Sequence, residues 1–164
     1  MTPSPPIEIR KSKIENFFSH PWCLLLSRLL LAAVMIGAAL PKLADPPGFA
    51  QSIHAYRILP LALVPPLALL LPWVELLAAL GLLLGFARRG GALLILAMML
   101  VFCGALGFNL ARGNPVDCGC FGAATAPRTK EQRLFDMKLA LLRDLGLALL
   151  ALHAIWGEGR KPDA

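Results

Sequence analysis

The sequence predicts an all-α membrane protein, a bundle of four transmembrane helices with almost no soluble domain. Of its 164 residues, 57% are hydrophobic and 16% are charged, and the mean hydropathy is +0.67. A helix needs roughly 20 mostly apolar residues to cross about 30 Å of hydrocarbon, and four segments of that kind take up more than half of the chain. We divide it into a polar tail (1–20), a transmembrane domain (21–157) and a C-terminal tail (158–164).

The first two spans are separated by a long polar connection. Residues Met1–His20 form a Pro-rich tail with a short interfacial helix expected over Ile14–Phe18. The apolar run Trp22–Leu40 predicts a retained first helix, because it is long enough to span and three more spans follow. In the connection Pro41–Leu59, we expect Asp45–Gly48 to break the helix and a short surface helix to follow over Phe49–Ile58.

The second and third spans are predicted to form an antiparallel pair. The second runs from about Pro60 to Phe86, and the third covers Gly91–Leu110. Three prolines lie in or near the start of the second span: Pro65, Pro66 and Pro72. Because proline removes backbone hydrogen bonds that lipid cannot replace, they predict a late helix start or a kink. The short turn Ala87–Gly90 then leads directly into the third span.

The longest loop, Ala111 to about Arg128, precedes the fourth helix. Thr129 followed by Gln132 is typical of a capping box, in which each residue satisfies a backbone amide of the other. The helix is then expected to run through Leu139 to Trp156. Its first turns are charged, so they are expected to project beyond the membrane.

Small and sulfur-containing residues inside the spans are interpreted as packing residues. Gly81 and Gly85 form a Gly-x-x-x-Gly pair, which permits close helix contact. Cys103 is interpreted as a small apolar filler of the third span. Cys23 is expected at the opposite end of the bundle from Cys118-Gly119-Cys120, and exchange with these two cysteines is not expected.

The net charge of +6 and the pI of about 9.6 indicate lipid headgroups rather than nucleic acid as the partner. The basic residues are scattered through short loops, as insertion topology requires. Seven Lys or Arg residues lie outside the spans on each side, but those on the side of the termini are packed into fewer residues. We therefore expect both termini in the cytoplasm.

Cys118-Gly119-Cys120 is the clearest candidate for chemistry. Two thiols separated by one glycine can close on each other, and the resulting small ring would be strained. Strained, exposed disulfides lie at the oxidising end of the scale, which suits a pair that passes oxidation on. The alternatives are reduced bystanders, a structural clip, or soft-metal ligation by Cu(I) or zinc, for which two thiolates alone are an incomplete set.

Charged residues inside the apolar runs form a second group of candidates. Each costs several kcal/mol in hydrocarbon unless it is paired or hydrated. Arg28 in the first span and Glu75 in the middle of the second can pair between antiparallel neighbours. Such a pair either acts directly in function or only fixes the packing of the helices.

Several polar residues are expected on the same side of the membrane as the cysteine loop. Arg143 and Asp144 follow the apolar start of the fourth helix closely, and Arg143 can stabilise a thiolate or bind an anionic reduced cofactor beneath the loop. Lys42 and Tyr56 are further candidates for shaping a cofactor pocket. The alternatives are snorkelling of Arg143 to the interface and an ordinary interfacial belt for the others.

Several motifs give the chain a resemblance to the methylamine utilisation protein MauE family, within the wider DoxX-like group, over about residues 22 to 156. The motifs are Arg28–Gly37, Pro41-Lys42-Leu43-Ala44-Asp45-Pro46, Phe49, Tyr56-Arg57-Ile58-Leu59-Pro60, Leu71-Pro72-Trp73-Val74-Glu75 and Asp117-Cys118-Gly119-Cys120-Phe121-Gly122. The last of these is the most diagnostic.

The resemblance implies an inner-membrane protein linked to periplasmic disulfide handling, with a thioredoxin-like partner of the MauD type. DoxX-like relatives imply a quinone as electron acceptor. The leading hypothesis is a membrane thiol oxidoreductase that uses Cys118 and Cys120. The alternatives are a non-catalytic membrane subunit or assembly factor, and a small transporter or metal-handling protein that uses Arg28 and Glu75.

Overall fold

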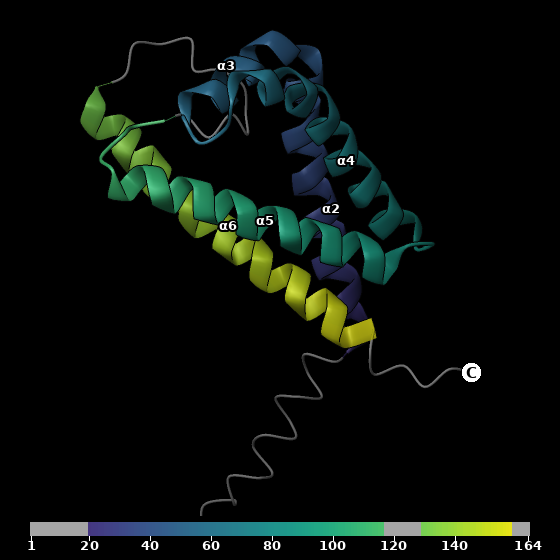
Figure 1. Cartoon of the computed structure of the whole chain (residues 1–164). Coiled ribbons are helices and arrows are strands. Elements are labelled where there is room, and N and C mark those ends of the chain that lie inside the picture. Colours follow the sequence, from purple (N-terminus) through teal and green to yellow (C-terminus); the bar gives the residue numbers. More distant parts are fainter. Residues whose placement is uncertain (1–19, 117–128, 159–164) are drawn as a thin grey trace, which may run out of the picture.

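The computed structural model describes residues 20–116 and 129–158, which form a helical membrane domain (Figure 1). Its elements are α2 (Pro21–Ala44), α3 (Pro46–Ala55), η1 (Leu61–Leu63), α4 (Val64–Leu84), α5 (Arg88–Ala111) and α6 (Lys130–Glu158). Four helices in this part of the chain are long and apolar enough to cross a membrane, so the predicted fold class is confirmed. The helix expected over Ile14–Phe18 and the Cys-Gly-Cys motif lie outside the described residues.

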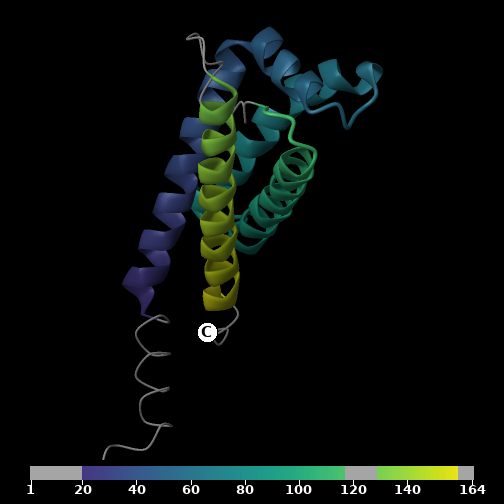
Figure 2. The same cartoon turned by 90° about the vertical axis from the view of Figure 1, so that its left-hand side faces the viewer.

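The four long helices form a closed bundle, in which each helix packs mainly against two others. α2 contacts α4 and α6, while α5 contacts the same two helices from the other side. α3 lies across one end of the bundle and packs mainly on α4. The first turn of α2 and the last turn of α6 lie together at the opposite end (Figures 1 and 2).

Small apolar residues fill the centre of the bundle, and large ones cover its outside. The main buried cluster contains many alanines together with Leu31, Met35, Leu82 and Ile95. Outside it, Leu26, Leu77 and Val101 are among many large apolar side chains that are more than half exposed. Lipid is the solvent that such a surface requires.

α2 continues further than the sequence predicts. The helix runs through Pro41 to Ala44, where a loop was expected, and the Asp45 amide donates to the Pro41 carbonyl oxygen at 3.1 Å. Proline lacks an amide hydrogen, but near the end of a helix this removes only one bond of the ladder. The extra turn makes Lys42 a helix residue and buries it to 3% exposure.

α3 begins within the segment that was expected to break the helix. Asp45 caps it, since its Oδ1 accepts a hydrogen bond from the Gly48 amide at 3.0 Å. Pro46 and Pro47 then occupy the first turn, where amide hydrogens have no partner within the helix and a fixed φ is favourable. The same proline chemistry therefore starts a helix here rather than ending one.

The start of α4 confirms the effect predicted for its prolines. A 3₁₀ turn at Leu61–Leu63 comes first, and the α-helix begins only at Val64, with Pro65 and Pro66 in its first turn. Pro72 lies inside the helix and is buried.

The turn between α4 and α5 comes earlier than the sequence predicts. Gly85 adopts a left-handed conformation (φ 82°) and ends α4, while α5 already begins at Arg88. Gly85 is therefore a helix cap rather than a residue of a helix–helix contact. The close contact is made by Gly91, where a Cβ atom would lie 2.8 Å from the Ala78 carbonyl oxygen.

The start of α6 confirms the predicted capping box. The Thr129 amide donates to Gln132 Oε1 at 3.0 Å, and the Gln132 amide donates to Thr129 Oγ1 at 3.3 Å. These two bonds satisfy donors that a helix start leaves open. They fix the point at which the chain re-enters the bundle after the cysteine loop.

Candidate functional site

A buried ion pair joins α2 to α4. Lys42 Nζ lies 2.5 Å from Glu75 Oε1 and 2.8 Å from Oε2, and the two residues are 3% and 1% exposed. An isolated charge at this depth costs about 3 kcal/mol or more in a membrane, so each residue depends on the other. Removing one partner of such a pair is more costly than removing both.

The Lys42 ammonium also contacts two aromatic rings. It lies 5.1 Å from the centre of the Phe49 ring and 5.4 Å from that of Phe102. Both distances are within the range of cation–π attraction. Because Phe49 belongs to α3 and Phe102 to α5, one ammonium group connects residues from four helices.

A second ion pair lies nearby on α6. Arg143 donates from Nε at 2.9 Å and from Nη2 at 2.7 Å to Asp144 Oδ1. Asp144 is 2% exposed, whereas the Arg143 side chain is 29% exposed. Both ion pairs line a cavity of about 20 Å³, which is enough for about one water molecule.

The partner of Glu75 is therefore Lys42, not Arg28. Arg28 Nη2 donates to the Leu82 carbonyl oxygen at 3.1 Å, about two turns along α4 from Glu75. Side chains on a helix lean toward its N-terminus. Arg28 accordingly leans away from Glu75, while Lys42, further along α2, leans back toward it.

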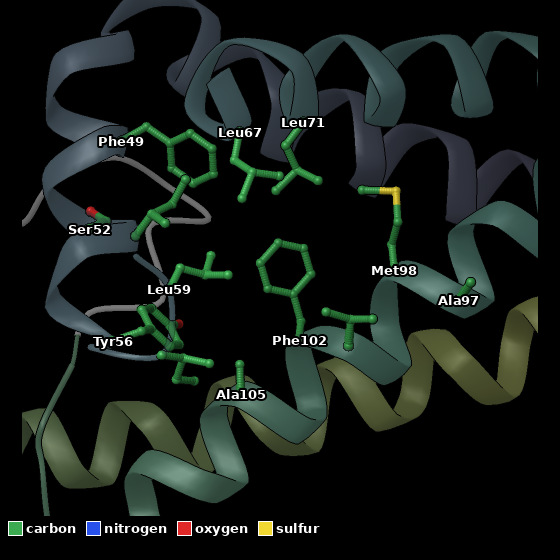
Figure 3. Close-up of a pocket in the computed structure, with 13 residues that line it drawn as sticks. Phe49, Ser52, Tyr56, Leu59, Leu67, Leu71, Ala97, Met98, Phe102 and Ala105 are labelled. Carbon is green, nitrogen blue, oxygen red and sulfur yellow. The ribbon is translucent and has the colours of Figure 1, made fainter. Parts of the chain in front are cut away.

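An apolar pocket of about 470 Å³ opens between α3, α4 and α5 (Figure 3). Phe102 and Met98 reach into it from α5, and Leu67 and Leu71 line it from α4. α3 and the segment after it contribute Phe49, Ser52, Tyr56 and Leu59. Among the lining residues, only Ser52 and Tyr56 carry hydroxyl groups, so the pocket suits a ligand that is mostly apolar.

The chain that leads into the cysteine loop is anchored beside this pocket. Asn114 Nδ2 donates to Asn109 Oδ1 at 3.0 Å and to the Ala55 carbonyl oxygen, at the end of α3, at 3.4 Å. The Val116 amide points at Met137 Sδ, 3.3 Å away, and Val116 is only 3% exposed. Tyr56 packs against the cluster around Val116 and also lines the pocket.

The structure divides the predicted cofactor residues between two places. Tyr56 lines the apolar pocket, whereas Lys42 and Arg143 both border the small cavity. Lys42 also contacts the aromatic wall of the pocket. Sequence reasoning missed Phe102, for which an apolar span offers no signal. It also missed Asn109, although an amide side chain near the end of an apolar span is a recognisable signal. In the structure this residue is fully buried.

Fold and site together define a multi-pass membrane protein with paired charges buried among four spans. The chain belongs to a family whose description is "Methylamine utilisation protein MauE", because the model of that family matches residues 20–157.

Three relatives described as methylamine utilization protein MauE are 35–36% identical to this chain. The alignment with the protein of Methylophilus methylotrophus covers 69% of this chain and 60% of that protein. For Methylorubrum extorquens the shares are 79% and 66%, and for Paracoccus denitrificans 88% and 74%. The chain thus spans about two thirds or less of the first two relatives. No solved structure matches it significantly.

Proposed function

We propose that the protein is a membrane thiol oxidoreductase of methylamine utilisation, in which Cys118 and Cys120 cycle between a dithiol and a disulfide. The electron donor is the dithiol of a periplasmic thioredoxin-like protein, and the acceptor is a quinone of the inner membrane. The similarity to methylamine utilization proteins supports the process, and the two cysteines support the chemistry.

The electrons and protons of this cycle balance. A thiolate of the partner attacks the Cys118–Cys120 disulfide, and a second partner thiol resolves the mixed disulfide, which leaves the partner oxidised and the two cysteines reduced. The cysteine dithiol then gives two electrons and two protons to the quinone. The disulfide is restored and a quinol leaves.

The observation that carries the proposal is the anchored segment before the motif. Asn114 and Val116 are tied to α3 and α6 next to Tyr56, at the edge of a pocket that opens within the membrane domain. Covalent geometry alone keeps the Cα atoms of Val116 and Cys118 within about 7 Å of each other. A dithiol that begins two residues after this anchor would be near a place that a lipid-soluble acceptor can reach.

The test is oxidation of a thioredoxin-like partner by membranes that contain the full chain. We expect Cys118→Ser and Cys120→Ser each to abolish quinone-dependent oxidation of the partner dithiol. Cys103→Ser and Cys23→Ser are matched controls and should leave it unchanged. A redox titration should place the disulfide well above the roughly −270 mV of thioredoxin.

The result that would overturn the proposal is full partner oxidation by the Cys118→Ser, Cys120→Ser double variant. In that case the loop serves only to dock a partner, and the protein is a non-catalytic subunit or assembly factor.

A further inference from the structure

The apolar pocket lies in the half of the bundle nearest the cysteine loop. Its α5 wall ends at Ala105, about 9 Å before the last residue of the helix. Its α4 wall consists of Leu67 and Leu71, in the first two turns after Val64. The pocket therefore shares one end of the domain with α3 and with the anchored segment Asn114–Val116.

The mouth of the pocket faces the lipid. Val101, which lines it from the middle of α5, is 72% exposed, and Ile58 and Leu59 are 45% and 41% exposed. In a membrane-spanning domain, exposed apolar side chains contact hydrocarbon. A ligand would thus enter sideways from the bilayer rather than from water.

We propose that this pocket is the binding site of the quinone ring, with the isoprenoid tail extending past Val101 into the lipid. The identity of the ligand rests on the proposed function, whereas the pocket itself does not. Its volume of about 470 Å³ is within the roughly 300–1,000 Å³ of ligand-binding pockets.

The lining fits a flat ring better than an acyl chain alone. Three aromatic side chains line the pocket and offer ring faces and edges for stacking: Phe49 of α3, Tyr56 at the C-cap of α3, and Phe102 of α5 (Figure 3). An acyl chain would use none of these features.

The buried ion pair holds two sides of the pocket in position. The Lys42 ammonium contacts Phe49 and Phe102, and it is itself fixed by Glu75. Tyr56 continues the wall toward Val116, two residues before Cys118. A quinone ring in this site would thus lie at the end of the domain where Val116 leads into the cysteine motif.

The test is binding of decylubiquinone, a benzoquinone with a short alkyl tail, to the detergent-solubilised full chain. Ala105→Phe places a ring in the pocket, and we expect it to weaken binding by about tenfold or more. Ala33→Phe adds the same ring at an exposed position of α2 and should leave binding unchanged. Tyr56→Leu, which removes one of the three rings, should weaken binding several-fold and serves if Ala105→Phe does not fold.

A photoreactive azido-quinone locates the site independently. We expect labelled peptides from residues 49–59 and 97–105. Labelling elsewhere, or equal binding by Ala105→Phe and Ala33→Phe, would show that the pocket is not the site. Complete protection by a fatty acid of similar length would show that an acyl chain occupies it and would also overturn the proposal.

The proposal for the pocket and the proposal for the redox cycle can be contradicted independently. In one result, partner oxidation depends on the two cysteines but persists fully in Ala105→Phe. That result would contradict quinone binding in the pocket and leave the proposed function intact. The opposite result is also possible: Ala105→Phe abolishes quinone binding, but Cys118→Ser leaves partner oxidation unchanged. That result would support the pocket and contradict the proposed function.

Discussion

At the scale of single residues, the buried charges are the most informative feature. Glu75 is recognisable in the sequence as a carboxylate that needs a partner, but Lys42 looks like a loop residue after Pro41. In the structure α2 continues past that proline, and the lysine reaches two carboxylate oxygens and two rings. The lean of helical side chains toward the N-terminus explains why Lys42 rather than Arg28 meets Glu75.

We predict that Glu75→Gln destabilises the protein by about 3–5 kcal/mol, because it leaves the Lys42 ammonium buried without an anionic partner. The double variant Lys42→Met, Glu75→Leu should be less destabilised than either single charge deletion. Unfolding of the solubilised protein in a denaturant series measures both.

Glu131→Gln provides the matched control, since this carboxylate is exposed in the first turn of α6. Its effect should stay within about 0.5 kcal/mol. Additive effects of the two changes at positions 42 and 75 would contradict the coupling inferred from the geometry.

At the scale of helices, a helix boundary can be predicted from the sequence where the residues that cap the helix are close together in the chain. The Thr129 and Gln132 box is readable in the sequence because both partners lie within one turn. The α4–α5 connection is not, because Gly85 and Gly91 are both small residues that flank the same short turn. Only the structure assigns one to the helix end and the other to the contact with α4.

We predict opposite effects of alanine at two adjacent glycines of α5. At Gly91 the new Cβ atom would lie 2.8 Å from the Ala78 carbonyl oxygen, so Gly91→Ala must push α4 and α5 apart and lower stability. At Gly90 nothing lies within 4 Å, and Gly90→Ala should be neutral or stabilise by up to about 1 kcal/mol. Thermal unfolding of both variants in the same detergent compares them directly, and equal melting temperatures would count against the contact.

At the scale of the whole molecule, an even number of spans brings the first and last residues of the membrane domain to the same end of the bundle. The start of α2 and the end of α6 lie at one end, and α3 lies at the other (Figure 2). The distribution of basic residues predicts which side of the membrane each end faces.

We predict that both termini are cytoplasmic and that the cysteine loop is periplasmic. In intact cells, a membrane-impermeant thiol reagent should label Cys118 in a variant whose other cysteines are replaced. It should not label Ser4→Cys or Pro162→Cys introduced into a chain without other cysteines. Labelling of the two terminal positions but not of Cys118 would invert the topology and remove the oxidising compartment from the proposed cycle.

The sequence by itself determined the four spans, the late start of α4 and the cap of α6. Each depends on neighbours in the chain or on the solvent around one segment, and lipid selects apolar segments one by one. Only the tertiary structure decided the Lys42–Glu75 pair, the role of Gly91 and the apolar pocket. These join residues that are distant in sequence, and their positions depend on helix length, register and side-chain direction together.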